Sequence, residues 1–182
     1  MSLDVRHYHV REAMRDGTPV TLRAPRADDR ERVRRAFLEL EPESVYTRLF
    51  RFKKDLTDDE LTRLTQPDFD RHLSLLVTIG DDDPTVIAAA NFVVLDPPER
   101  AATRAEVAFT VEEDYQGQGL ASMLLRHLVA IARERGLTHL EAEVLAGNAA
   151  MLKVFARSGL PMMQRHDAGV VHVEMALDAA QG

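Results

Sequence analysis

The stretch VAFTVEEDYQGQGLASMLLRHL, from Val107 to Leu128, joins an expected strand to an expected helix through a glycine-containing turn. An apolar run is followed by an acidic turn, and then by Gly117 and Gly119 with one glutamine between them. The apolar stripe of the helix consists of Leu120, Leu124, Leu128 and Ile131, and Gly136 follows its end at Arg135. This junction is the first indication of both fold and function.

The two glycines have two explanations. The first amides of a helix lack partners and carry partial positive charge, so glycines there let an anion approach closely. Gln116 and Gln118 add neutral donors, and a diphosphate suits such a site. Alternatively, the glycines only relieve a tight turn. The segment is a weak match to the dinucleotide-binding fingerprint, and a P-loop is excluded because no Gly-Lys-Ser/Thr follows.

Length and composition indicate one globular domain. The chain has 182 residues, of which 45% are hydrophobic and 29% charged, and it has no cysteine. Disulfides, thiolate metal sites and a cysteine nucleophile are therefore excluded.

The net charge of −7 argues against a nucleic-acid partner, which requires a basic surface. The N-terminus has no apolar secretion signal, and no apolar run reaches the roughly 18 residues of a membrane span. We expect a cytoplasmic protein without a membrane partner.

Periodicity and turn residues predict an α+β fold. The expected strands cover residues 20–22, 72–80, 85–96, 105–111 and 139–145, followed by a closing hairpin around 167–169. The expected helices cover residues 27–40, 43–49, a segment capped by Thr57 and Glu60, 120–135, and a segment from Asn148 to Gly159. This order predicts one domain with a mixed, mostly antiparallel, twisted sheet flanked by helices.

The motifs resemble a known family. YQGQGLA is similar to the Gln/Arg-x-x-Gly-x-Gly/Ala signature of the GNAT N-acetyltransferases, through Gln116, Gly119 and Ala121. GNAAMLKVFARSGL is similar to the later Asn-containing segment of that superfamily, with Leu160 in place of its usual Phe. DGTPVTLRAPRADD, LEPESVYTRLF, LTQPDFDRHLSL and AEVAFTV resemble the catalytic domain of Pat-type bacterial protein lysine acetyltransferases. The resemblance extends from Asp16 to Leu177.

The resemblance implies a GNAT domain over residues 16–182, after an N-terminal extension of residues 1–15, with central strands that splay apart. It implies that acetyl-CoA is the cosubstrate and lies between those strands. The expected coenzyme-binding residues are Phe109, Val111, Gln116, Gly117, Gln118, Gly119, Leu120, Ala121, Asn148 and Met151. Asn148 also has a local explanation as a helix cap. Segments 43–50 and 66–72 are expected on the acceptor side.

Glu106 is the expected catalytic residue. Alternation in AEVAFTV places Glu106 with the small residues Ala108 and Thr110, opposite the apolar set. By sequence alone it could be an ordinary solvent-facing glutamate. The resemblance implies a general base, which an amine of pKa near 10.4 requires at neutral pH. Backbone amides of residues 109–111 are the expected donors to the developing oxyanion.

Two further expectations concern proton donation and metals. Phe155 occupies the position at which many GNAT enzymes place a tyrosine that protonates the leaving thiolate, and it has no proton to give. No metal site is expected, because the pairs His7 and His9, and His172 and Glu174, each lack an evident third ligand.

We therefore expect an acetyl-CoA-dependent N-acetyltransferase that acts by direct attack in a ternary complex. A protein lysine is the expected acceptor, and a homodimer is allowed. The alternatives are a small-molecule amine as acceptor, or a non-catalytic acyl-CoA sensor.

Overall fold

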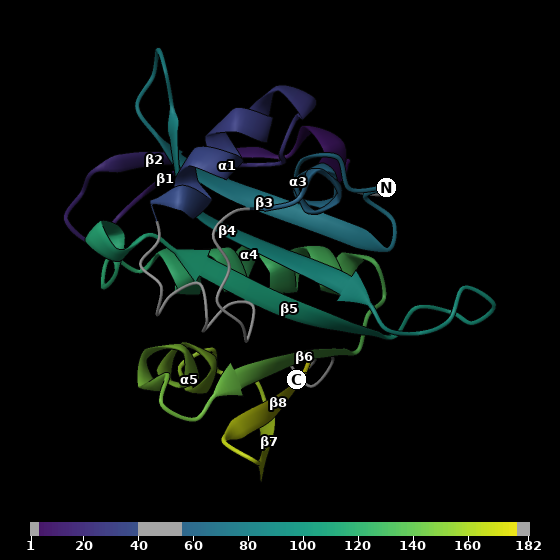
Figure 1. Cartoon of the computed structure of the whole chain (residues 1–182). Coiled ribbons are helices and arrows are strands. Elements are labelled where there is room, and N and C mark those ends of the chain that lie inside the picture. The colour runs from purple at the N-terminus through teal and green to yellow at the C-terminus, as the bar shows by residue number, and fades with distance from the viewer. Residues whose placement is uncertain (1–3, 40–55, 178–182) are drawn as a thin grey trace.

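A mixed sheet of eight strands forms the framework of the chain in a computed structural model that describes residues 4–39 and 56–177 (Figure 1). The strands are β1 (His9–Ala13), β2 (Pro19–Arg23), β3 (His72–Ile79), β4 (Thr85–Val94), β5 (Arg104–Val111), β6 (His139–Leu145), β7 (Met162–Asp167) and β8 (Val170–Ala176). The α-helices are α1 (Arg30–Leu38), α3 (Asp58–Thr65), α4 (Leu120–Glu134) and α5 (Ala149–Ala156). Short 3-10 helices are η1 (Val5–His7), η2 (Ala27–Asp29) and η3 (Glu113–Tyr115).

The strands follow the order β1-β2-β3-β4-β5-β6-β8-β7. All neighbours are antiparallel except β5 and β6, which are parallel. The predicted α+β domain with a mostly antiparallel sheet is therefore confirmed, including both predicted hairpins, β3–β4 and β7–β8.

Helices cover both faces of the sheet, and strand alternation decides which side chains meet them. Leu73, Leu75 and Val77 of β3 belong to the buried cluster that contains α4. Leu76, between them, packs with residues of α1 and α3 on the opposite face. Figure 1 shows α4 behind the central strands and α1 in front of them.

The apolar stripe of α4 forms the centre of the larger core. Leu120 is 2% exposed, and Leu124, Leu128 and Ile131 are fully buried. Burying each such side chain contributes roughly 1.5–3 kcal/mol. The continuous stripe decides which side of α4 faces the sheet, and the short connection over residues 112–119 keeps the N-terminus of α4 near the end of β5.

The predicted capping box at the start of α3 is confirmed. The Thr57 hydroxyl accepts a hydrogen bond from the Glu60 N–H at 3.2 Å, and the Glu60 carboxylate accepts one from the Thr57 N–H at 3.4 Å. In the closing hairpin Ala168 and Gly169 take φ angles of 49° and 81°, in the left-handed region that tight turns use.

The helix predicted over residues 27–40 begins as η2 and continues as α1. Asp29 lies at the junction of the two helices, and its fully buried carboxylate accepts two hydrogen bonds from Arg23, at 2.7 and 2.6 Å. Burial alone would raise the pKa of Asp29, but hydrogen bonds from Arg23 and from the backbone N–H of Arg26 hold it below its usual value. This ion pair joins β2 to the start of α1.

The N-terminus differs from the expectation. Residues 9–13, expected in an extension, form β1 and pair with β2 from His9–Arg23 to Ala13–Pro19, so the sheet begins before residue 16. The helix predicted over residues 43–49 lies outside the described residues. Among the described helices, none is long and apolar enough to cross a membrane.

Candidate active site

The two central strands separate at Glu106. β5 and β6 pair through Arg104–His139, Ala105–Leu140 and Glu106–Glu141, and their ladder ends there. β5 stays paired with β4 as far as Val111, while β6 stays paired with β8 as far as Leu145. Both strands thus continue beyond Glu106 without pairing with each other, as expected for splayed central strands (Figure 1).

The glycine-containing loop connects the end of β5 to α4. Gly117 and Gly119 have φ angles of 80° and 85°, which glycine adopts without steric cost. Gly119 is the N-cap of α4 and, as a glycine, makes no side-chain hydrogen bond to cap the helix. The first amides of α4 are therefore accessible to a ligand, and the helix dipole favours an anionic one.

A cleft of about 940 Å³, called here the main cleft, lies between β5, the loop before α4, the β6–α5 connection and α5. All but one of the residues expected to bind the coenzyme line it: Phe109, Val111, Gln116, Gly117, Gly119, Leu120, Ala121, Asn148 and Met151. Gln118 lines a neighbouring groove instead, and its side-chain oxygen accepts a hydrogen bond from the Asp16 N–H at 3.2 Å.

Asn148 caps α5 as its local sequence predicts. Its side-chain oxygen accepts a hydrogen bond from the Met151 N–H at 3.2 Å. Both residues line the main cleft. The local role of Asn148 is thus compatible with a ligand-binding one.

Phe155, at the position of the tyrosine in many GNAT enzymes, is a core residue. It is 1% exposed, and its ring meets the Phe109 ring edge to face with a centroid distance of 5.9 Å. Phe109 in turn lines the main cleft. The ring of Phe155 therefore supports the floor of the cleft and offers no proton donor.

Glu106 is exposed on the opposite face of β5 from Phe109. It shares that face with Ala108 and Thr110, and Thr110 lines both the main cleft and a second cavity. This second cavity, called here the apolar cavity, measures about 100 Å³ and lies between α1, α3 and strands β3 to β5.

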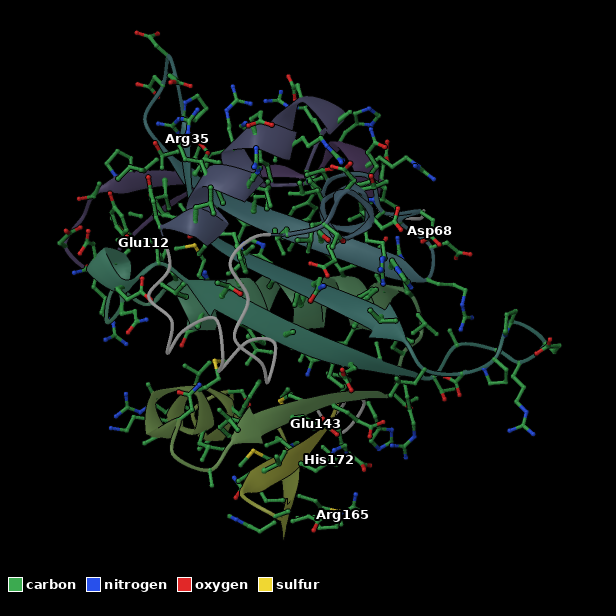
Figure 2. The ribbon with its side chains drawn as sticks, viewed as in Figure 1. Arg35, Asp68, Glu112, Glu143, Arg165 and His172 are labelled. Carbon is green, nitrogen blue, oxygen red and sulfur yellow. The ribbon has the colours of Figure 1, made fainter. Side chains whose placement is uncertain are left out.

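Glu112 is an acidic residue of the apolar cavity that was not expected from the sequence. It stands at the end of β5 beside α1 (Figure 2) and lines the cavity with Thr110. Burial raises the pKa of Glu112, and the nearby carboxylates of Asp114, Glu113 and Glu39 raise it further. The alternation that places Glu106 and Thr110 on one face would also have selected Glu112.

Of the two segments expected on the acceptor side, the structure describes residues 66–72. Segment 43–50 lies outside the described residues. Segment 66–72 lines neither cavity; Asp68 within it accepts hydrogen bonds from the N–H groups of Asp70, Arg71 and His72 at 2.9 Å each. Its observed role is to form the turn before β3.

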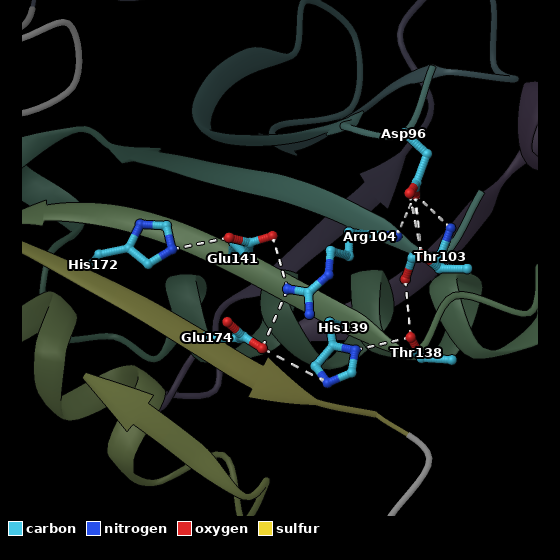
Figure 3. A network of polar contacts seen from close by, with 8 residues as sticks. All are labelled: Asp96, Thr103, Arg104, Thr138, His139, Glu141, His172 and Glu174. Carbon is cyan, nitrogen blue, oxygen red and sulfur yellow. Dashed lines mark hydrogen bonds and ion pairs between the residues drawn. The ribbon is translucent and has the colours of Figure 1, made fainter. Parts of the chain in front are cut away.

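The structure supplies a third residue to the pair His172 and Glu174. Pairing of β6 with β8 brings Glu141 to them, and their ligand atoms lie within 4.8 Å of one another. However, Arg104 Nη1 lies 3.3 Å from Glu141 and 3.2 Å from Glu174, between the two carboxylates (Figure 3). The guanidinium of Arg104 thus bridges two of these three groups, and His172 contacts the other oxygen of Glu141 at 2.9 Å.

Among the described residues, the cationic side chains that line the main cleft are Arg15, Lys153 and Arg157, none of which was expected from the sequence. Lys153 and Arg157 belong to α5 and its C-terminal cap, so their helix spacing could have indicated them. Arg15 follows β1 and is distant in sequence from the rest of the cleft, so no local signal was available.

The chain is similar to known proteins. Residues 31–160 match the model of the acetyltransferase (GNAT) family. The chain is 37% identical over 162 residues to acetyltransferase Pat of Mycolicibacterium smegmatis, covering 89% of this chain and 47% of that protein.

Solved structures of acyltransferases also match this chain. The GNAT domain of PAT from S. lividans matches with a TM-score of 0.85 and 35% identity, covering 93% of this chain and 97% of that one. A cAMP-binding acyltransferase from Mycobacterium smegmatis matches with a TM-score of 0.63 and 30% identity, covering 97% of this chain and 50% of that one. The chain therefore spans about half the length of Pat and of the cAMP-binding acyltransferase.

Proposed function

The chain belongs to the GNAT family of acetyltransferases, and we propose that it transfers the acetyl group of acetyl-CoA to a primary amine, with a protein lysine as acceptor. The enzyme class follows from the family. The lysine acceptor is supported by the resemblance to Pat-type enzymes, of which this chain spans about half.

The observation that carries the proposal is where the β5–β6 ladder ends. Glu106 occupies the last paired position, so its carboxylate stands where the strands part. Further along β5 the main cleft reaches the uncapped N-terminus of α4 at Gly119. The main cleft thus offers an anion-binding end, and Glu106, which is not among its lining residues, precedes Phe109 of that lining on the same strand. Transfer from a phosphate-bearing thioester requires both an anion site and a carboxylate.

We place acetyl-CoA along the main cleft, with its diphosphate at the loop before α4 and its thioester towards Glu106. Its diphosphate would lie at Gly117 and Gly119, whose backbone amides and helix dipole favour an anion. Its pantetheine arm would run between the strands along Phe109 and Val111, towards Asn148 on the other side. The thioester would then reach the Glu106 end of the opening.

The reaction needs no covalent enzyme intermediate. The acceptor ammonium loses a proton to Glu106, through water, and its nitrogen forms a bond with the thioester carbonyl carbon. The carbonyl oxygen gains negative charge, for which the N–H groups of residues 109–111 are the proposed donors. As the carbon–sulfur bond breaks, the nitrogen gives its second proton to water, and the thiolate takes a proton from solvent because Phe155 cannot donate one.

The apolar cavity suits the acceptor side chain. Its lining is mainly apolar, like the methylene stem of lysine, and it meets the main cleft at Thr110. Glu112 adds a carboxylate that can attract an ammonium group. A lysine approaching through this cavity would bring its nitrogen to the face of β5 that carries Glu106.

Changing Glu106 to Gln tests the catalytic assignment. We expect acetyl-CoA affinity within about twofold of the parent, and a fall in turnover of about 10²- to 10⁴-fold, the usual contribution of a general base. Binding is measured by calorimetry, and turnover by release of free CoA. The matched control is Glu99→Gln, the same chemical change in an exposed loop. Full turnover by Glu106→Gln would exclude the assignment.

The acceptor class is tested with labelled acetyl-CoA and a cell extract. Label in the protein fraction, at lysines identified by peptide mass spectrometry, supports the proposed acceptor. Label only in the small-molecule fraction would replace it with a small amine. Binding of acetyl-CoA without any transfer would leave an acyl-CoA sensor.

A further inference from the structure

The turn after β1 lies against the glycine-containing loop. The Arg15 N–H donates a hydrogen bond to the Gln118 carbonyl at 3.1 Å, and the Asp16 N–H donates one to the Gln118 side chain at 3.2 Å. Two elements about a hundred positions apart in the chain are thereby held together. The loop before α4 is therefore shaped in part by the β1–β2 connection.

The side chain of Arg15 extends over this loop. Its Nη1 donates a hydrogen bond to the Gly117 carbonyl at 3.2 Å. Its Nε lies 3.5 Å from the position that a Cβ atom on Gly119 would occupy. Arg15 also lines both the main cleft and the neighbouring groove that contains Gln118. The guanidinium thus lies at the rim of the cleft, directly beside the N-cap of α4.

The guanidinium retains binding capacity. Over residues 4–39 and 56–177 it donates to one acceptor, the Gly117 carbonyl, and forms no ion pair. A guanidinium has five N–H donors in a planar fork that matches phosphate oxygens. Several donors and the full charge are therefore accessible from the cleft.

A diphosphate at this loop needs a cation. The helix N-terminus supplies only about half a unit of positive charge, whereas a diphosphate carries about two negative charges. Gln116 is neutral, and Lys153 and Arg157 approach the cleft from α5 rather than from the loop. Arg15, in contrast, is a cationic side chain that contacts the loop itself.

We propose that Arg15 binds the diphosphate of acetyl-CoA, so that the β1–β2 turn forms part of the coenzyme site. This inference rests on the proposed function. It assigns a phosphate ligand to a part of the chain that precedes the recognised sequence motifs. A competing explanation is that Arg15 only supports the loop through the Gly117 carbonyl.

Arg15→Gln and Arg15→Lys separate these explanations. Acetyl-CoA affinity is measured by calorimetry at low and high salt. We expect Arg15→Gln to bind roughly ten- to hundredfold more weakly, the usual effect of losing a charged hydrogen bond. Arg15→Lys should retain most of the affinity. The loss should shrink at high salt, because it arises from charge. The control is Arg11→Gln, on β1, whose side chain is 63% exposed and pairs with Asp81 at 3.8 Å.

A second arm varies the ligand. S-acetyl-pantetheine lacks every phosphate, and 3′-dephospho-acetyl-CoA keeps only the diphosphate. We expect Arg15→Gln to lose affinity for both diphosphate-bearing coenzymes, while its kcat/KM with S-acetyl-pantetheine equals that of the parent. If the loss vanished with the 3′-dephospho coenzyme, Arg15 would instead contact the 3′-phosphate and the inference would be wrong.

Two other results would also overturn the inference. One is parental acetyl-CoA affinity in Arg15→Gln. The other is a loss that does not depend on salt, together with a lower melting temperature of the free protein, as expected for a support of the loop. The proposed function fails separately, because in that case the parent itself would not bind acetyl-CoA.

Discussion

Replacing Gly119 by alanine tests the backbone on which the proposed coenzyme site depends. Gly119 has a φ angle of 85°, and an L-residue in the left-handed region costs roughly 1–2 kcal/mol. The new Cβ would lie 3.5 Å from Arg15 Nε and 3.6 Å from its Cγ, which are ordinary contact distances. No steric clash is added, so the free energy of unfolding should fall by about 1–2 kcal/mol.

Gly117 and Gly147 provide the controls. Gly117→Ala, with φ 80° and open space around its Cβ position, should lose a similar amount. Gly147→Ala also points into open space but has no positive φ, so it should lose nothing. Urea denaturation measures each value, and a loss of 1–2 kcal/mol corresponds to a melting temperature lower by roughly 2–8 °C.

Coenzyme binding gives an independent readout. The methyl group added at Gly119 lies between the Arg15 side chain and the start of α4, where we place the diphosphate. Acetyl-CoA affinity should therefore fall about tenfold or more, as one charged hydrogen bond is lost. Equal stability of Gly119→Ala and Gly147→Ala would refute the backbone argument. Unchanged affinity would refute the diphosphate site.

Two further predictions concern the core. Asp29→Asn leaves the buried Arg23 without its counter-charge and should lower the unfolding free energy by about 3–5 kcal/mol at neutral pH. Because the pKa of Asp29 is lowered in the folded state, this deficit should shrink as pH falls below about 4, as urea titrations at several pH values would show. Phe155→Tyr buries a hydroxyl against Phe109 and should cost about 1–3 kcal/mol without raising turnover, whereas increased turnover would restore a proton-donor role to this position.

Features with a local physical cause could be predicted from the sequence. The stripe of α4, the Thr57–Glu60 capping box and the Asn148 cap each depend on residues within a few positions of one another. The glycine-containing loop belongs to the same class, because accessible amides at a helix start follow from the start itself. Hence the proposal of an anion site at this loop could be made before the fold was known.

An edge strand is harder to predict from the sequence than a central strand. β1 has only one neighbouring strand, and its side chains alternate between exposed and half-buried. The sequence HVREA therefore shows little apolar alternation, and residues 9–13 were expected in an extension. Hydrogen bonding to β2, rather than burial of its own side chains, makes this segment a strand.

Pairings between distant segments were decided by the tertiary structure alone. The position of Glu106 at the end of the β5–β6 ladder depends on strand register, which the alternation within one strand does not specify. Arg15 reaches Gly117 across 102 positions, and Glu141 meets Glu174 only because β6 pairs with β8. The sequence by itself determined which groups could bind an anion or accept a proton. The folded sheet decided which of them share one cleft, because hydrogen bonds between strands join residues that no local pattern relates.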